Sequence, residues 1–298
     1  MTYEYYIGVI DEAAVLAECG PMRLVIQAWR RGQPQIGQAW QAAEEAIAYL
    51  ERIARCRKVL SRPWHRIEKL PKDELALRMI DSAKTVGDDD LTPMAAVAGT
   101  IADAVADRLF ERGMTKVVVD NGGDIAIRLA KGAKVKVGVR PSIRSAAVSH
   151  VFGLDSRMQS WGVTTSGFGG RSFTRGIASA VTALAASAAV ADAASTAIAN
   201  ACFLESKKIR QMPAEQIDPN TDLASLAVTV GIGELSQAEI KAALKKALQR
   251  AEDLVACGVI LGALICHENI FVMTSSLKTF IRMSGNRRHN GEGALARC

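Results

Sequence analysis

The chain has 298 residues, of which 49% are hydrophobic and 23% are charged; these ordinary globular values exclude a disordered chain. Its length allows one large domain or two fused halves. Lys and Arg give a formal net charge of +6, which suits an anionic small-molecule ligand, while only 5% of residues are aromatic, which argues against a nucleic-acid surface that stacks bases.

The first part of the chain alternates between predicted strands and predicted helices. Branched and aromatic residues predict strands over 2–10 and 22–29, and apolar residues at three-and-four spacing predict a helix over 38–60. A second helix is predicted over 75–85. A third, over about 93–112, has proline in its first turn and is rich in alanine, so its backbone can approach a sheet or a ligand closely.

The middle of the chain begins with a predicted β-hairpin over 116–128, in which two β-rich runs flank an Asp-Asn-Gly-Gly-Asp turn. Further strands are predicted over 135–140 and 147–154. A loop rich in glycine and hydroxyl residues follows over 164–171, and an alanine-rich helix is predicted over about 187–203.

In the last third, Ser236 and Glu239 form a capping box for an amphipathic helix that ends at Cys257. A pair of strands is predicted over about 259–274. The basic, glycine-rich residues 284–298 predict a flexible tail. We therefore expect a single domain over 1–283, and two similar halves meeting near residue 150 remain an open alternative.

Two alanine-rich runs, 95–99 and 188–192, match each other at a fixed offset. This match indicates an internal duplication in which each half places a small-residue helix beside a sheet. Together, the predicted elements indicate an α+β fold with mainly antiparallel sheets covered by small-residue helices.

The cysteines form no CxxC pair and no zinc-binding spacing, as is typical of reduced thiols in the cytosol. Acidic residues interrupt the segment before Cys19 where a signal peptide needs an apolar run. The longest uncharged run, 176–191, is too short and too polar to span a bilayer. We expect a cytoplasmic protein that binds neither a membrane nor nucleic acid; a homo-oligomer remains open.

Three segments concentrate the residues that suit chemistry. The first is the turn Asp120-Asn121-Gly122-Gly123-Asp124, where glycines let the backbone approach a ligand and the carboxylates suit a ribose hydroxyl or a metal. The alternative is that these residues only form the turn, because Asn, Gly and Asp are favoured there in any case.

The second segment joins Thr164, Thr165, Ser166 and Gly167 to Arg171 through further glycines. Backbone N–H groups, hydroxyls and a guanidinium together suit an anion. Alternatively, Ser166 or Thr165 acts as a catalytic nucleophile, although no known nucleophile motif surrounds them.

The third segment contains Asp192 and Thr196, which lie four residues apart on one face of the predicted helix and suit a hard cation. A carboxylate within a buried alanine-rich helix is costly unless it is paired, bound to a metal or capping a backbone. The alternative is that Asp192 forms a structural hydrogen bond to a neighbouring loop.

These segments occur in an order that resembles one family. Val86-Gly87, Thr92–Gly99, Asp120–Asp124, Gly162–Gly167 and Ala191–Ala197 are together similar to the uncharacterised ApbE-like proteins (family 0280), relatives of the thiamine-biosynthesis lipoprotein ApbE, a flavin transferase that moves FMN from FAD to protein. The resemblance is good over about residues 75–202 and implies an ApbE-like fold.

The resemblance also implies residue roles. Gly122, Gly123 and Asp124 match the Gly-Gly-Asp turn of the flavin nucleotide site, and Thr165, Ser166 and Gly167 match the Thr-Ser-Gly element. Asp192 and Thr196 match the residues that bind Mg²⁺ beside the FAD pyrophosphate. The transferases also carry a His-Ile-x-Asp-Pro-x-Thr-Gly segment between these elements, and residues 168–187 of this chain lack it, which argues against transfer of FMN to a protein.

The leading hypothesis is therefore an ApbE-like enzyme that binds an anionic small molecule, most plausibly a flavin nucleotide (FAD or FMN) with Mg²⁺. Asp192 and Thr196 would hold the metal. The cofactor would contact Asn121, Gly122, Gly123, Asp124, Gly167 and Arg171. Two alternatives remain: a small-molecule hydrolase or ring-opening enzyme that uses Ser166 or Thr165, and a flavin-binding protein without catalytic activity.

Overall fold

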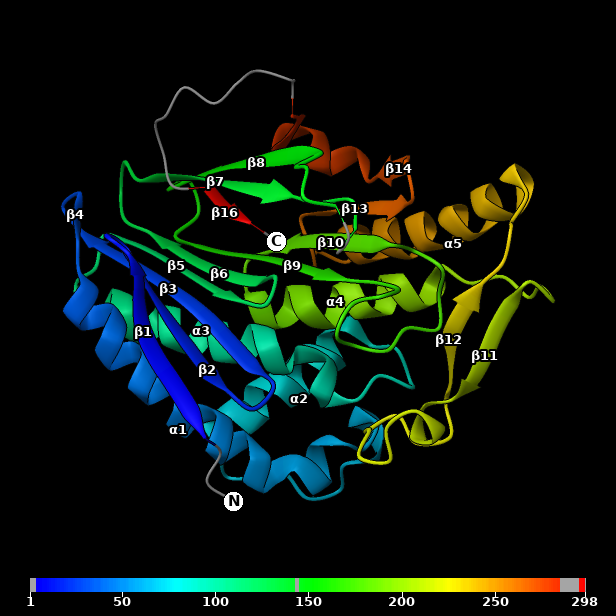
Figure 1. Ribbon diagram of the computed structural model, residues 1–298, viewed down its shortest axis with the longest axis horizontal. Helices are drawn as coiled ribbons and strands as arrows, with labels where there is room; N and C mark the ends of the chain where they lie inside the picture. The colour runs from blue at the N-terminus through cyan, green and yellow to red at the C-terminus, as the bar shows by residue number, and fades with distance from the viewer. Residues whose placement is uncertain (1–3, 143–144, 285–294, 298) are drawn as a thin grey trace.

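The structure is a computed structural model, and it describes residues 4–142, 145–284 and 295–297. A long sheet runs through the middle of the molecule, with helices packed against one of its faces (Figure 1). The helices are α1 (Ile36–Leu60), α2 (Glu74–Val86), α3 (Val97–Glu111), α4 (Ala188–Ala201) and α5 (Gln237–Ala256). Short 3₁₀ turns are η1 (Trp64–Arg66), η2 (Pro93–Ala96), η3 (Ala214–Gln216) and η4 (Ser275–Thr279).

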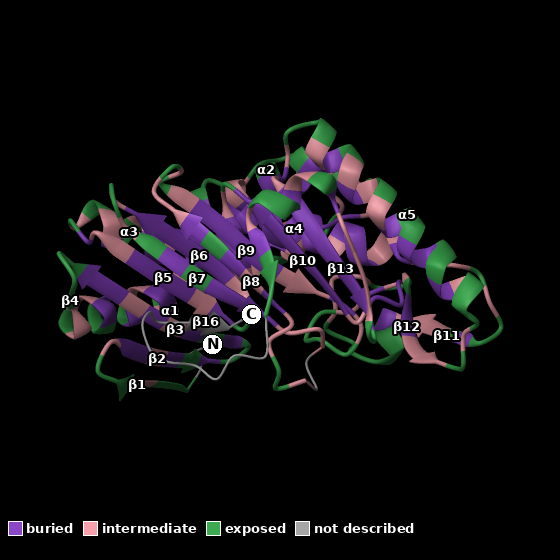
Figure 2. Cartoon of the chain, turned by 90° about the horizontal axis from the view of Figure 1, so that it is seen from above, coloured by how far each residue is buried: buried purple, intermediate pink, exposed green. Residues whose placement is uncertain are grey.

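All neighbouring strands of the long sheet are antiparallel. Its strands lie in the order β1 (Tyr5–Asp11), β2 (Ala14–Cys19), β3 (Met22–Arg30), β5 (Lys116–Asn121), β6 (Asp124–Leu129), β9 (Ser160–Ser166), β10 (Ala180–Ala185), β13 (Gly262–His267) and β14 (Ile270–Met273), and the short β4 (Gln33–Pro34) pairs with β3. The central strands are almost wholly buried, whereas β1 is an exposed edge (Figure 2).

A smaller sheet covers the other face of the long sheet. Its strands lie in the order β15 (Ile281–Met283), β8 (His150–Asp155), β7 (Lys134–Val139) and β16 (Leu295–Arg297), with β16 parallel to β7. A separate hairpin, β11 (Ile209–Pro213) and β12 (Ala227–Ile232), projects beside α5 (Figure 1). One hydrophobic core therefore lies between the long sheet and the helices, and a second lies between the two sheets.

Small residues bring α4 very close to the long sheet. All of its alanines except Ala201 are buried, and Gly162 on β9 faces its first turn. A Cβ atom at Gly162 would lie 2.4 Å from the backbone nitrogen of Ala188, so only glycine fits this position. This contact fixes the first turn of α4 against the strand that ends at Ser166.

The predicted fold class is confirmed: the protein is α+β, with mainly antiparallel sheets and small-residue helices. The helix predicted over 93–112 divides into η2 and α3. The sequence did not lead us to predict β2, β4, β9, β10, β11, β12, β15 or β16, and 164–166, expected in a loop, instead end β9. The run that forms β10 is rich in alanine, which favours helices, and burial between two strands overrides that preference.

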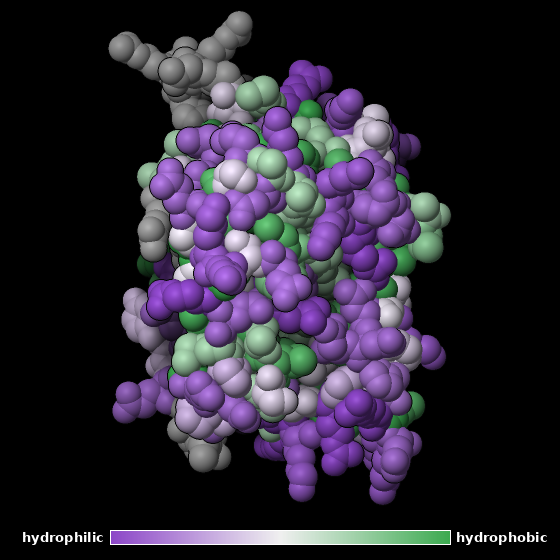
Figure 3. Space-filling view, turned by 90° about the vertical axis from the view of Figure 1, so that its right-hand side faces the viewer, coloured by the Kyte–Doolittle hydropathy of each residue, from purple (hydrophilic) through white to green (hydrophobic). Residues whose placement is uncertain are grey.

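Other expectations meet the structure only in part. The capping box of Ser236 and Glu239 is present at the start of α5. Of the expected tail, 295–297 form β16, while 285–294 and 298 lie outside the described residues. Among the residues described, no helix is long and apolar enough to cross a membrane. On the side that carries α5, hydrophilic groups surround small hydrophobic patches (Figure 3).

Candidate functional site

Two adjoining cavities lie where the turn between β5 and β6 meets the first turn of α3. The first chamber has a volume of about 320 Å³ and the second of about 340 Å³. They share six lining residues, so we treat them as one cleft: Pro21, Val97, Ala98, Asp124, Arg171 and Ser172.

All the site residues expected from the sequence line this cleft. Eight of them line the first chamber: Asn121, Gly122, Gly123, Asp124, Thr165, Ser166, Gly167 and Arg171. The remaining two, Asp192 and Thr196, line the second chamber, which Asp124 also lines. Segments that lie up to 75 residues apart in the sequence are thus brought together, as the resemblance implies.

The alternation of side chains along β5 and β6 decides which carboxylates reach the cleft. Asp124 and Arg128 share the face of β6 that packs on the helices, because Ile125 and Ile127 between them belong to the core under the smaller sheet. Asp120 points to the opposite face from Asp124 and accepts the backbone N–H of Gly123 at 2.7 Å. Asp124, but not Asp120, therefore faces α4.

The same alternation separates the two hydroxyls expected to carry chemistry. The Oγ1 atom of Thr165 lies 2.8 Å from that of Thr182, its neighbour on β10, on the face turned toward the smaller sheet. Ser166 points to the helix face, and its Oγ atom is buried without a hydrogen-bond partner among the described residues. Of these two hydroxyls, that of Ser166 is the one not engaged in a hydrogen bond with the described residues.

The turn between β5 and β6, which contains Gly122 and Gly123, lies against the guanidinium of Arg171. Gly122 has φ +69°, and a Cβ atom on it would lie 3.1 Å from Nη1 of Arg171. The guanidinium donates to the backbone oxygen of Pro21 at 3.2 Å and so extends across the turn. The left-handed backbone favours glycine here, and a side chain at this position would also make the Arg171 guanidinium shift slightly.

Asn121 has a structural role that the sequence did not reveal. Its side-chain amide donates to the backbone oxygen of Ala98 at 3.2 Å, and its Oδ1 atom accepts the N–H of Arg23 at 3.4 Å. Asn121 therefore ties β5 to α3 and β3 beside the first chamber.

Asp192 combines two of the roles considered for it. Its Oδ2 atom accepts the backbone N–H of Gly99, in the first turn of α3, at 2.9 Å. That bond is the structural one foreseen as an alternative, yet Asp192 also lines the second chamber. Asp124 similarly accepts the N–H of Thr165 at 3.3 Å. One oxygen of each carboxylate is thus held by the backbone.

Asp124 and Asp192, here called the carboxylate pair, are electrostatically strained. Burial raises the pKa of Asp192 to about 7, although the N–H groups of Gly99 and Ala98 favour its charged form. Burial, and then the negative charge of Asp192, raise the pKa of Asp124 well above its usual range. Within the described part of the chain, neither carboxylate forms an ion pair.

The donor set of the carboxylate pair suits Mg²⁺. Asp124, Asp192 and Thr196 offer hard oxygen ligands around the second chamber. The described residues contain no cluster of three or more His, Cys, Asp or Glu side chains able to enclose a metal. Mg²⁺ usually takes only one or two carboxylates from a protein and completes its shell with water and phosphate oxygens, so the residues fit that ion.

The cleft also has polar residues that the sequence analysis missed. Arg140 and Ser142, which follow β7, line the first chamber. Asp90, Arg175 and Asp222 line the second chamber, with Arg175 paired to Asp90 and Asp222 bonded to Thr92. No local motif marks these residues, because distant segments bring them to the cleft.

Histidine does not contribute to either chamber within the described residues. His150 packs against Phe271, and Nδ1 of His267 lies 2.8 Å from the backbone oxygen of Ile177. The ring of His65 meets that of Trp64 edge to face, and His289 lies outside the described residues. Neither His150 nor His267 therefore replaces the histidine of the transferase segment.

Asp120 predicts a measurable pH dependence of stability. Burial raises its pKa from 3.8 to about 6, so between these values the folded protein holds a proton that the unfolded chain has released. The contribution of Asp120 to the free energy of unfolding should therefore fall as pH rises from about 4 to about 6. Urea denaturation at several pH values should show a weaker fall in Asp120→Asn, which can still accept the N–H of Gly123. An unchanged pH dependence in that variant would contradict the assignment.

Comparison with known proteins places the chain among relatives that are themselves named only as a family. A UPF0280 protein from Archaeoglobus fulgidus is 40% identical over 112 residues, which cover 38% of this chain and 43% of that protein. One from Methanococcus aeolicus is 36% identical over 94 residues, which cover 31% and 38%. The matched stretches thus span less than half the length of these relatives.

Solved structures give a more distant likeness. Flavinyl transferase ApbE from Pseudomonas stutzeri, in its apo form, is 14% identical, with a TM-score of 0.49 over 94% of this chain and 96% of that one. Flavin transferase ApbE from Vibrio cholerae is also 14% identical, with a TM-score of 0.49 over 93% and 99%. Similarity at this level says nothing about substrate or reaction.

A family model that matches most of the chain shows to which family the protein belongs. The family model described as "AbpE bacteria" matches residues 9–276, which is most of the chain. The expected membership of an ApbE-like family is thereby confirmed, and the protein belongs to the AbpE bacteria family.

Proposed function

We propose that the protein is an enzyme that binds a flavin nucleotide, FAD or FMN, together with Mg²⁺ in the two-chambered cleft. The observation that carries this proposal is the carboxylate pair: the half-buried Asp124 and the buried Asp192 line the same chamber, their charges interact, and they lack an ion-pair partner among the described residues. Such a pair is costly unless a cation accompanies it.

The first chamber suits the anionic and planar parts of the ligand. Arg140 and Arg171 line it with positive charge, and the N–H groups of the glycine-rich segments can approach phosphate oxygens. Leu50 and Ile101 add apolar surface to the same chamber, which suits an aromatic ring. The carboxylate pair and Thr196 would hold the metal at the junction with the second chamber.

Arg171, Gly122 and Ser166 would each have a defined role in binding the ligand. Bound Mg²⁺ would supply positive charge that polarises a phosphate group. Arg171 would neutralise phosphate from the other side, and Gly122 leaves room for the guanidinium. Ser166 would donate its otherwise unpartnered hydroxyl to the ligand. The cleft residues could thus bind and orient a phosphate group without a histidine.

The direct test is calorimetric titration of the protein with FAD, in Mg²⁺ and in EDTA. Asp192→Asn keeps an oxygen for the Gly99 N–H but removes the charge that would hold the metal. We expect FAD affinity to fall about tenfold or more (~1.4 kcal/mol) in EDTA and in this variant. The exposed Asp253 on α5 provides a matched control, because Asp253→Asn removes a charge far from both chambers.

The absence of heat and of any change in flavin fluorescence, in Mg²⁺ and in EDTA alike, would contradict flavin binding. Binding that is equally tight in EDTA and in Asp192→Asn would contradict the metal site while leaving the ligand in place. The two parts of the proposal are therefore tested separately.

A second candidate function is a small-molecule hydrolase with Ser166 as the nucleophile. The observation in its favour is the buried, unpartnered Oγ atom of Ser166 beside the first chamber. The same observation places this candidate second, because a serine nucleophile is normally activated by a hydrogen-bonded base.

Turnover of p-nitrophenyl acetate and p-nitrophenyl phosphate tests this candidate. Ser166→Ala should abolish hydrolysis while circular dichroism and melting temperature stay unchanged. Thr165→Val is the matched control, because its hydroxyl lies on the other face of β9 and should not matter for turnover. Hydrolysis that persists in Ser166→Ala, or that is absent from the unmodified protein, would rule out the serine mechanism for these substrates.

A further inference from the structure

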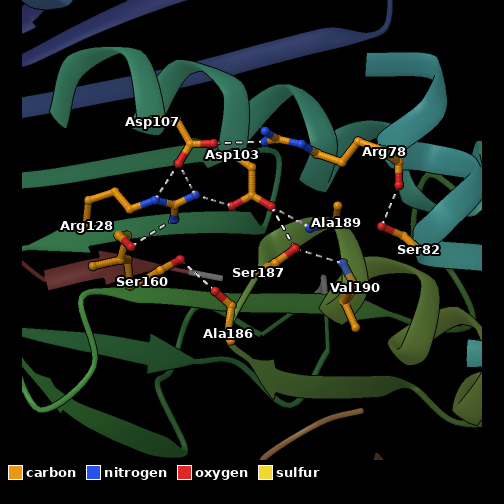
Figure 4. A network of polar contacts seen from close by, with 11 residues as sticks. Arg78, Ser82, Asp103, Asp107, Arg128, Ser160, Ala186, Ser187, Ala189 and Val190 are labelled. Carbon is orange, nitrogen blue, oxygen red and sulfur yellow. Dashed lines mark hydrogen bonds and ion pairs between the residues drawn. The ribbon is translucent and has the colours of Figure 1, made fainter. Parts of the chain in front are cut away.

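We propose that Asp103 is a positioning residue, which fixes Asp192 relative to Asp124 although it touches neither chamber. This inference rests on the proposed function, because it concerns the geometry of the same metal-binding carboxylates. It is carried by a polar network that joins β6, α3 and α4, in which Asp103 and Arg128 are buried and Asp107 is partly exposed (Figure 4).

Asp103, on α3, caps the first turn of another helix. Its Oδ2 atom accepts the backbone N–H of Ala189 at 2.9 Å and the hydroxyl of Ser187 at 3.0 Å, and Ser187 is the N-cap of α4 (Figure 4). Asp103 is 1% exposed, so these bonds do not compete with solvent. A carboxylate is well placed there, because a helix N-terminus carries partial positive charge and unpaired N–H groups.

Asp192, on α4, makes the reciprocal interaction with the first turn of α3. Its Oδ2 atom accepts the N–H of Gly99, in the first turn of α3. Each helix therefore caps the other, and the two bonds lie about one helical turn apart on both helices. A displacement of α4 relative to α3 would have to break both bonds.

The backbones of these helices also leave no room for adjustment. A Cβ atom at Gly99 would lie 2.2 Å from the backbone oxygen of Ala188, so α3 meets the first turn of α4 in direct backbone contact. Any shift in the position of the first turn of α4 therefore also moves Asp192, which lies four residues after Ala188 on the same rigid helix.

Arg128 connects this helix pair to the strand that carries Asp124. Its Nη2 atom donates to Oδ1 of Asp103 at 2.8 Å, and the guanidinium side chain is 7% exposed. Arg128 and Asp124 lie four residues apart on the same face of β6. One chain of contacts thus runs from β6 through Arg128 and Asp103 to α4, and its ends carry the carboxylate pair.

Asp107 provides a matched control within the same network. It bonds to Arg128 through Nε at 2.8 Å and to Arg78 at 3.0 Å, but its hydrogen bonds do not reach α4 (Figure 4). Because Asp103 is more buried than Asp107, a role in stability alone predicts that Gly99 exchange and Mn²⁺ affinity change only in proportion to the stability that each of Asp103→Asn and Asp107→Asn loses. Positioning of Asp192 predicts that only Asp103→Asn changes the carboxylate pair.

The experiment compares these two variants with the unmodified full chain in two measurements. The first is hydrogen exchange of the Gly99 and Ala189 amides by NMR, which needs no ligand. The second is the affinity for Mn²⁺ as a probe of the metal site. In Asp103→Asn an amide NH₂ replaces one carboxylate oxygen, so the side chain can no longer accept from both Arg128 and α4.

We expect faster exchange at the amide of Gly99, whose N–H bonds to Asp192 and not to the side chain of residue 103, together with Mn²⁺ affinity about tenfold weaker in Asp103→Asn. In Asp107→Asn both quantities should stay close to those of the unmodified protein. Equal effects of the two variants, or unchanged Gly99 exchange in a folded Asp103→Asn, would overturn the positioning role. If Asp103→Asn does not fold, Ser187→Ala, which removes one partner of Asp103, replaces it with the same expected outcomes.

Failure of the proposed function gives a different result. If the unmodified protein does not bind Mn²⁺, the metal site is wrong. The exchange of Gly99 then still decides whether Asp103 holds the two helices in place.

Discussion

The structure depends on the contact between the first turns of α3 and α4. Gly99 meets the backbone oxygen of Ala188 where even a methyl group would collide, and Gly162 lets β9 approach the same turn of α4. Because the backbones are so close, Asp192 reaches the N–H of Gly99 and also lines the second chamber. Small residues in these helices thus build the site as well as the core, since larger side chains would separate the elements that carry it.

Charge is distributed unevenly around this contact. On one side, Asp103 is compensated by Arg128 and by the N-terminus of α4. On the other side, Asp124 and Asp192 face the cleft without an ion-pair partner among the described residues, and burial raises the pKa of both. Isolated buried carboxylates are costly, so a cation bound with the ligand would relieve the repulsion between them. In the proposed arrangement, the charge-compensated network around Asp103 fixes the position of the carboxylate pair, whose charges have no such compensation.

Much of this arrangement could be predicted from the sequence, because it depends on local signals. Short stretches of sequence contain the Asp-Asn-Gly-Gly-Asp turn, the spacing of Asp192 and Thr196, and the capping box of α5. Each residue expected at the site lines the cleft. The rest depends on long-range contacts. Strand β10 is rich in alanine and became a strand through burial, and Arg128 reaches Asp103 only after β6 and α3 have packed. The face of the sheet on which the Thr165 side chain lies also depends on the extension of β9 to Ser166, which the sequence did not reveal.

The central claim is that the carboxylate pair binds a divalent cation beside a flavin nucleotide. The most direct measurement is a crystal structure of the protein with FAD and Mn²⁺, with data collected to record the anomalous scattering of manganese. We expect an anomalous peak for a manganese ion coordinated by Asp124 and Asp192, with phosphate oxygens of the nucleotide completing its shell next to Arg171. A nucleotide bound elsewhere, or a cleft that holds FAD without a peak between these two carboxylates, would contradict it.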